Sequence, residues 1–242
     1  MPFARESLAN YFTEGVRSLV RAEVEKPEKL YRAPRIYDDL LSSQPLCFNL
    51  FGELALDHEL ASRAVGRLLG KQAKVTAIEF EHSPGRWNPR FTNDGSAFDV
   101  FIAYEARGAP GFLGVEVKYV EDLDGDEAAH RRRYDELAEA MDIFDPVELS
   151  RLGRRPLEQF WRDHLLACSM LLDQDSGFHE GQFVVLYPEA NTVVADAVSA
   201  YRACLLDQRT FTTWTLEALL DALDEVSAGG WVCEVRQRYM SE

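Results

Sequence analysis

The apolar run Gly111-Phe-Leu-Gly-Val-Glu-Val-Lys-Tyr-Val120 carries two charged residues in its second half, Glu116 and Lys118. In a short strand, residues two positions apart share a face, so Glu116 and Lys118 point one way while Val117 points the other. A carboxylate and an amine on a buried strand destabilise the fold unless something pairs with them. Taken alone, the two charges leave open an ordinary ion pair on a solvated edge strand.

A second acid, Asp99, lies in the preceding apolar run, residues 98–104. Residues 105–110 join the two runs and contain the turn residues of a hairpin, so the runs are predicted to be neighbouring strands. Two acids and a lysine on adjacent strands predict a divalent-metal site with an amine beside it. This arrangement is the outline of phosphodiester chemistry, provided that Asp99, Glu116 and Lys118 converge in one cleft.

The charge of the chain bears on its partners. The formal net charge of −15 argues against a simple nucleic-acid coat, because phosphate binding depends mostly on Lys and Arg. Residues 121–148 hold eleven acids against three arginines, a net −8, so the remainder is only mildly acidic. Of 26 basic residues, 21 are Arg and five are Lys, and Lys118 stands in the sole Glu-x-Lys. Since a Lys amine can lose its proton when desolvated, this lysine is a candidate for chemistry.

We expect one domain, residues 1–242, with residues 1–45 as a helical N-terminal extension, because there is no repeat and no Gly/Ser-rich linker. No stretch approaches the roughly 18 to 20 continuous apolar residues that cross a bilayer, so no membrane partner is expected. The first residues have no apolar signal core, and the four cysteines lie far apart without a Cys-x-x-Cys pair. These features predict a soluble protein of the reducing cytoplasm.

The apolar periodicity predicts an α/β fold, a mixed sheet flanked by helices. Asp57 is expected to cap a helix that Gly70 ends, Pro156 fits the first turn of a strongly apolar helix, and Thr215 caps a late helix. The predicted strands cover residues 75–81, 98–104, 111–120 and 182–187. The predicted helices cover residues 3–25, 37–41, 58–69, 127–144, 156–172, 195–206 and 216–226, and a last short element covers residues 231–239.

Four passages, in this order, resemble a known family. They are Ser42-Ser-Gln-Pro-Leu-Cys-Phe-Asn-Leu-Phe-Gly52, Ser96-Ala-Phe-Asp99, Gly114-Val-Glu-Val-Lys118 and Gln159-Phe-Trp-Arg-Asp-His-Leu-Leu166. Over residues 40–190, the chain resembles the PD-(D/E)xK nuclease superfamily, and more closely a bacterial branch of restriction-endonuclease-like proteins. The resemblance implies an α/β restriction-endonuclease-like fold, with a mixed sheet of about four to five strands.

The same resemblance implies a role for each site residue. Asp99 and Glu116 would hold Mg²⁺ or Mn²⁺, with the carbonyl of Val117 as a further ligand. Lys118 would orient or deprotonate the attacking water, or stabilise the transition state. Gln159, on the following helix, would orient the water or a phosphate.

Some features of the family pattern are less directly matched. Many relatives add a carboxylate from the N-terminal helix, and Glu53, Asp57 and Glu59 all lie near the expected position. Glu81, which ends the first predicted strand, is another candidate neighbour of the metal. The Pro that often precedes the first acid is replaced here by Phe98.

Three residues near the motifs have ordinary structural interpretations. His164 lies in an apolar stretch and is predicted to be a hydrogen-bonded packing residue. Arg86 and Arg90 lie in a polar loop, residues 82–96, where they could touch phosphate but are predicted to be surface residues.

Together, these observations favour a metal-dependent nuclease that hydrolyses DNA phosphodiester bonds. Two alternatives stay open: a catalytically silent interaction module of the same fold, and a hydrolase of a small phosphorylated substrate, which a narrow, acid-lined cleft would favour. DNA is the expected partner. A homodimer is left open, because double-strand cutters often pair two active sites.

Overall fold

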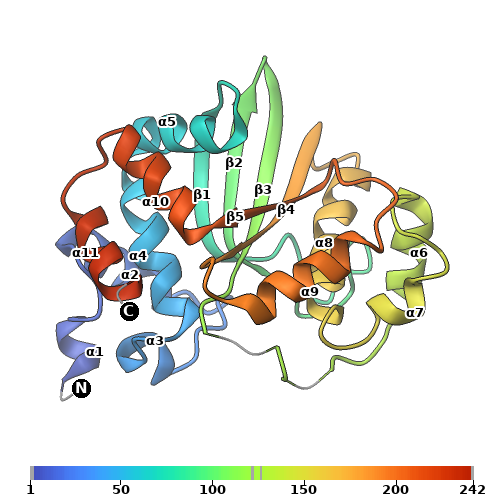
Figure 1. Cartoon of the computed structure of the whole chain (residues 1–242), viewed down its shortest axis with the longest axis horizontal. Coiled ribbons are helices and arrows are strands. Elements are labelled where there is room, and N and C mark those ends of the chain that lie inside the picture. The colour runs from blue at the N-terminus through green and yellow to red at the C-terminus, as the bar shows by residue number, and fades with distance from the viewer. Residues whose placement is uncertain (1–2, 121–122, 126, 241–242) are drawn as a thin grey trace.

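The computed structural model describes residues 3–120, 123–125 and 127–240, which build a five-stranded mixed sheet flanked by helices (Figure 1). The strands are β1 (Lys74–His82), β2 (Phe98–Ala106), β3 (Ala109–Val117), β4 (Glu180–Tyr187) and β5 (Phe211–Thr215), in that order across the sheet. β1, β2 and β3 form an antiparallel meander, and β4 and β5 continue the sheet in parallel with β3. The expected α/β mixed sheet is confirmed, and β5 is an additional strand that the periodicity did not predict.

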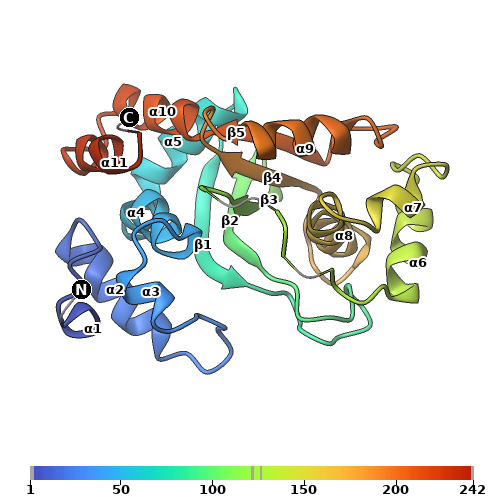
Figure 2. The same cartoon turned by 60° about the horizontal axis from the view of Figure 1, so that its bottom comes forward.

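Helices cover both faces of this sheet, as Figure 2 shows. On one face lie α4 (Ser43–Leu56), α5 (His58–Leu69) and α10 (Leu216–Glu225), and on the other lie α6 (Arg132–Met141), α8 (Glu158–Leu172) and α9 (Thr192–Arg202). Val100 and Ile102 of β2 belong to the first core, while Phe101 between them belongs to the second. Alternating side chains of one strand therefore supply two separate cores.

The face that Glu116 uses follows from the same alternation. Val115 and Val117 lie in the core under α4 and α5, so Glu116 and Lys118 point to the opposite side, toward α8. This arrangement agrees with the expectation from residues 111–120. The strand itself ends at Val117 rather than at residue 120.

The N-terminal region differs from the predicted single helix over residues 3–25. It forms α1 (Ala4–Ser7) and α2 (Glu14–Val24), because Leu8 adopts a left-handed conformation with φ of 48°. Thr13 then starts the second helix by accepting a hydrogen bond from the Val16 N–H at 3.1 Å. A short α3 (Arg35–Asp38) replaces the helix predicted at residues 37–41.

Helix α4 was not predicted as a helix, although part of it was recognised as a family passage. Ser42 caps it, and residues 45–52 are buried without exception. A helix that is buried on all sides has no polar face, so its sequence lacks the periodicity that reveals an amphipathic helix. The predicted extension over residues 1–45 thus runs into a helix that packs against the sheet.

Several helix ends agree with the capping residues. Asp57 Oδ1 accepts hydrogen bonds from the N–H groups of Glu59 and Leu60, and Gly70 ends α5 in a left-handed conformation. Thr215 caps α10 as predicted.

Other boundaries shift. α6 is shorter than residues 127–144, α8 begins two residues after Pro156, and α9 begins three residues before residue 195, after the cap Asn191. α7 (Leu149–Leu152) was not predicted, and residues 231–239 form the helix α11 (Trp231–Tyr239). Within the described part of the chain, every helix is too short or too polar to cross a membrane.

Candidate active site

The β2–β3 hairpin places Asp99 beside the end of β3. Val100 pairs with Val115, so Asp99 lies one residue further along the same two strands. The Val117 N–H donates a hydrogen bond to Asp99 Oδ2 at 2.8 Å. Because the N–H and C=O of a strand residue point toward the same neighbouring strand, the Val117 carbonyl also faces the side of Asp99.

Phe98, which stands where relatives often have Pro, packs on the neighbouring strand. Its ring lies so close to Gly114 that a Cβ added there would clash with the ring. Gly114 is therefore the residue that lets Phe98 lie flat against β3. This contact holds the backbone immediately before Asp99.

Glu116, Lys118 and Gln159 form a closed hydrogen-bonded triangle. Lys118 Nζ donates to Glu116 Oε1 at 2.7 Å and to Gln159 Oε1 at 2.9 Å. Gln159 Nε2 in turn donates to Glu116 Oε1 at 2.6 Å. Gln159 reaches the triangle from the first turn of α8, so one helix and one strand together fix the position of the lysine amine.

The interpretation of Glu116 and Lys118 as a pair on a solvated edge strand is wrong. Glu116 and Lys118 are only 6 % and 7 % exposed, and β3 lies between β2 and β4 in the sheet. Beyond the end of β3, the Lys118 N–H still donates to the Leu186 carbonyl of β4 at 2.8 Å. The two charges are buried and positioned by the backbone on both sides.

The electrostatics of Asp99 suit a cation. Burial raises the pKa of Asp99 well above its ordinary value, and the negative charge of Glu116 raises it further. The Val117 N–H and the Lys118 amine act in the opposite direction but do not cancel these effects. A positive ion between the two carboxylates would favour the ionised form of both.

A further acid, Asp163, was missed by sequence reasoning. It lies one helical turn after Gln159, and burial together with the charge of Glu116 raises its pKa well above the ordinary value. Its Oδ2 is buried and has no hydrogen-bond partner among the described residues. The spacing of four from Gln159 on one helix face is the signal that could have revealed it.

Two adjoining cavities meet at these residues. The smaller, of about 490 Å³, is lined by Asp99, Glu116, Gln159 and Asp163, among others. The larger, of about 1080 Å³, shares the first three and opens toward several basic side chains. Its basic lining residues are Lys29, Arg32, Arg35, Arg86, Lys118, Arg155 and Arg162, and its acidic ones are Glu81, Asp99, Glu116 and Asp124. We call the two cavities together the cleft. Basic residues outnumber acids in the larger cavity, whereas the smaller one is acid-rich, with Glu81, Asp94, Asp99, Glu116 and Asp163 against three arginines.

The sequence profile of the PD-(D/E)XK nuclease superfamily matches residues 2–241. The chain belongs to this superfamily. The match covers almost the whole chain and so extends beyond residues 40–190, where the motifs lie. No curated protein and no solved structure matches the sequence. The PD-(D/E)XK assignment therefore stands on the family profile, and the five-stranded mixed sheet agrees with the fold of that superfamily.

The extra carboxylate that many PD-(D/E)XK relatives add does not come from the expected positions. Glu53 accepts a hydrogen bond from the Thr13 hydroxyl, Asp57 caps α5, and Glu59 is exposed. None of the three lines the cleft. Glu81 does line it, beside Arg86 at 2.8 Å.

The residues present fit a divalent metal, a cofactor that PD-(D/E)XK nucleases typically use. In the described ranges, no group of three or more His, Cys, Asp or Glu side chains is arranged to hold a metal ion. Two carboxylates and a carbonyl are nevertheless a suitable set for Mg²⁺, which usually keeps several waters and takes only one or two carboxylates from the protein. Burial and the charge of Glu116 raise the pKa of Asp99, so a bound cation would favour its ionised form.

The three residues that were given ordinary structural interpretations, His164, Arg86 and Arg90, lie in different surroundings. His164 is fully buried and hydrogen-bonded to Tyr201 and Thr210, as predicted. Arg90 forms ion pairs with Asp173 and Asp175. Arg86, by contrast, lines the larger cavity of the cleft, where it pairs with Glu81 at 2.8 Å.

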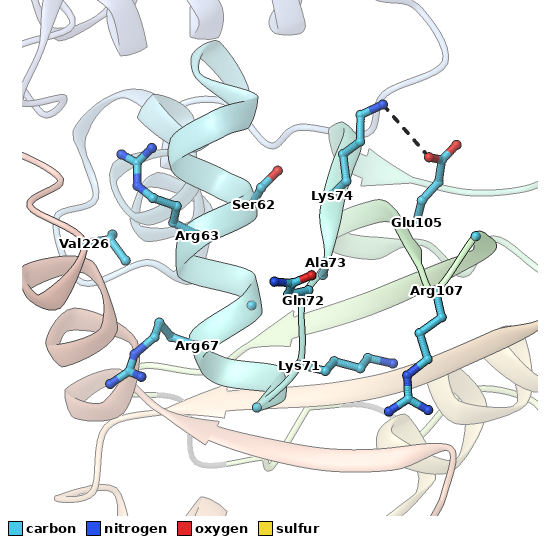
Figure 3. Close-up of a pocket in the computed structure, with 13 residues that line it drawn as sticks. Ser62, Arg63, Arg67, Lys71, Gln72, Ala73, Lys74, Glu105, Arg107 and Val226 are labelled. Carbon is cyan, nitrogen blue, oxygen red and sulfur yellow. Dashed lines mark ion pairs between the residues drawn. The ribbon is translucent and has the colours of Figure 1, made fainter.

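Another cavity, of about 960 Å³, lies beside α5 and the β2–β3 turn (Figure 3). Among the described residues that line it, Glu105 is the one acid, so these residues offer no pair of carboxylates for a metal. Most of its cations are already paired, Lys71 with Glu180, Lys74 with Glu105 and Arg67 with Glu225. Its five basic residues are Arg63, Arg67, Lys71, Lys74 and Arg107. Basic charge alone therefore does not distinguish the cleft; the acid pair and the buried lysine do.

Proposed function

We propose that this chain is a divalent-metal-dependent nuclease that hydrolyses DNA phosphodiester bonds in the cytoplasm. The observation that carries the proposal is the convergence of Asp99, Glu116, Lys118 and Gln159 in one cleft with a basic rim. Membership of the PD-(D/E)XK superfamily supports it. For double-strand cleavage, two copies of the chain would each supply one such cleft.

Asp99, Glu116 and the carbonyl of Val117 are the residues that would hold the metal, which we propose to be Mg²⁺ or Mn²⁺. When bound, the ion lowers the pKa of a water and neutralises charge on the scissile phosphate. The protein's part is to keep both carboxylates on one side of adjacent strands. The hydrogen bond from the Val117 N–H fixes the orientation of Asp99 for this purpose.

Lys118 is placed to act on the attacking water or on the phosphate. Its amine is held at 2.7 Å from Glu116 and 2.9 Å from Gln159, so its position is defined before substrate arrives. A buried ammonium donates hydrogen bonds to developing negative charge more effectively than one in water. Gln159 orients both neighbours, since its amide accepts from Lys118 and donates to Glu116.

The rim of the cleft supports a nucleic-acid substrate despite the acidic chain. Arg32, Arg35, Arg86, Arg155 and Arg162 all line the larger cavity. Guanidinium groups bind phosphate through paired N–H donors. A rim of arginines can therefore follow several phosphates of one strand. A small phosphorylated substrate would need fewer of them.

The test is cleavage of plasmid DNA and of DNA and RNA oligonucleotides with Mg²⁺ or Mn²⁺, for wild type and Lys118→Met. We expect metal-dependent DNA cleavage that falls roughly 10²- to 10⁴-fold in Lys118→Met. Lys26→Met is the matched control, because Lys26 pairs with Glu23 at 2.5 Å outside the cleft. Absence of metal-dependent cleavage of every substrate would favour the silent interaction module. Hydrolysis of small phosphate esters but not of nucleic acid would favour the third alternative.

A further inference from the structure

The side chain of Asp163 has no role in the function proposed above, although it lies in the same cleft. Asp163 is 3 % exposed, and its Oδ2 has no hydrogen-bond partner in the described part of the chain. Buried carboxylates are ordinarily paired or hydrogen-bonded. A buried carboxylate with an unpartnered oxygen, on a residue that lines a cavity, therefore points to a ligand of this carboxylate.

Arg162 and Lys118 favour the ionised form of Asp163 through their charge, but each makes its hydrogen bonds to other residues. Lys118 donates to Glu116 and Gln159. Arg162, the preceding residue, donates to Glu158 at 3.0 Å and lies 4.0 Å from Asp94. Neither Lys118 nor Arg162 forms an ion pair with Asp163.

The position of Asp163 restricts what it can bind. It lines the smaller cavity together with Asp99 and Glu116, the two carboxylates that would hold a divalent ion. Among the described side chains, no three acids are arranged to ligate one ion directly. Mg²⁺ and Mn²⁺ in such sites keep coordinated waters, whose hydrogens need acceptors. The carboxylate of Asp163, a residue that lines this cavity, is such an acceptor.

We propose that Asp163 is a positioning residue of the metal site, and that its carboxylate accepts a hydrogen bond from a water of the divalent ion. This inference rests on the metal site of the proposed function. Through that water, α8 helps to place the ion, in addition to placing Lys118 through Gln159. The competing interpretation is a neutral, protonated Asp163 with no part in metal binding.

The experiment measures Mn²⁺ binding to the whole chain without nucleic acid, by electron paramagnetic resonance and calorimetry. Outer hydrogen-bond partners of metal sites typically change metal affinity by roughly 10- to 100-fold, so we expect a loss of that size in Asp163→Asn. Asp163→Glu, which keeps a carboxylate, should recover part of the affinity. Asp173→Asn is the matched control, since Asp173 follows the same helix, pairs with Arg90 and lies outside the cleft.

The outcomes separate this inference from the nuclease proposal. Mn²⁺ affinity in Asp163→Asn equal to that of wild type overturns the inference, even if DNA is cleaved. Mn²⁺ binding that weakens in Asp163→Asn but not in Asp173→Asn supports it, even if no nucleic acid is cleaved. Absence of Mn²⁺ binding by wild type overturns both the inference and the metal site. A thermal unfolding scan in chelator shows that each variant is folded before its affinity is compared.

Discussion

Two consecutive residues of α8, Asp163 and His164, are both buried but differ in their hydrogen bonding. His164 Nδ1 lies 2.9 Å from the Tyr201 hydroxyl, and Nε2 lies 2.8 Å from the Thr210 hydroxyl, so both ring nitrogens have partners. Asp163 Oδ2 has none among the described residues. Burial therefore does not distinguish a polar group that holds the fold together from one available to a ligand. Hydrogen bonding does.

The two residues also lie on sides of α8 that have different surroundings. His164 joins α8 to α9 and to the residue before β5, where a neutral ring is sufficient. On the other side, α8 meets Glu116, where charge is concentrated without full compensation. Substitutions at the two sites should therefore affect different properties, activity in the cleft and stability at His164.

The largest effect is expected from Asp99→Asn. An asparagine oxygen still accepts the hydrogen bond from the Val117 N–H, but the neutral side chain is a much poorer ligand for a divalent ion. We expect DNA cleavage to fall roughly 10²-fold or more. The melting temperature in chelator should stay the same or rise, because a buried like-charge pair is relieved. Loss of folding in this variant would mean that Asp99 is needed for stability as well as for activity.

His164→Leu should lower the stability of the protein and leave its cleavage activity unchanged. It leaves the buried hydroxyl of Tyr201 and the half-buried hydroxyl of Thr210 without their partner, which destabilises by about 1–3 kcal/mol in total. Denaturant unfolding measures this change in the free energy of unfolding. Cleavage per folded molecule should be unchanged, and a matching loss of activity would assign His164 a part in the chemistry.

Asp163→Asn should raise stability in chelator. Removing a buried charge without a partner is expected to increase the free energy of unfolding by about 1–3 kcal/mol at pH 7.5. Added Mn²⁺ should narrow the difference between this variant and wild type, because it stabilises wild type more. A variant less stable than wild type in chelator would show that Asp163 has a structural partner after all.

The smallest effect concerns pH. Burial lowers the pKa of His164 from its ordinary value of 6.5 to about 3. The unfolded chain takes up a proton below pH 6.5 and the native state does not, so the stability contributed by the neutral ring is present above pH 6.5 and lost as pH falls. The stability difference between wild type and His164→Leu should shrink by up to about 1.4 kcal/mol per pH unit below pH 6.5. Denaturation at pH 7.5, 6.0 and 5.0 checks this, and a constant difference contradicts it.

The sequence predicted the part of the site that depends on short-range pattern. Alternation along residues 111–120 places Glu116 and Lys118 on one face, and a hairpin necessarily brings Asp99 alongside. Capping residues such as Asp57 and Thr215 act within a few positions of themselves, so the helix starts they predict agree with the structure. These features need no knowledge of the tertiary fold.

What the sequence did not predict depends on long-range packing. Helix α4 is buried on every side, which removes the polar face that periodicity detects. An aspartate in a helix usually points to solvent. The burial of Asp163 depends on the packing of α8 in the folded molecule, so the sequence pattern did not predict it. After the break at Leu8, Tyr11 also makes a long-range contact, because its hydroxyl donates to the carbonyl of Ile36, 25 residues further along the chain.

The contact between Phe98 and Gly114 has a consequence for the evolution of the family. Since the ring occupies the space above Gly114, neither position can change freely while the other is kept. We expect the residues at positions 98 and 114 to vary together among relatives. Where Pro precedes the first acid, the position of Gly114 should hold a larger residue. An alignment in which both positions change independently would contradict this coupling. Where the coupling holds, the proline of the family motif and the phenylalanine here are two solutions to the same problem of holding the first acid in place.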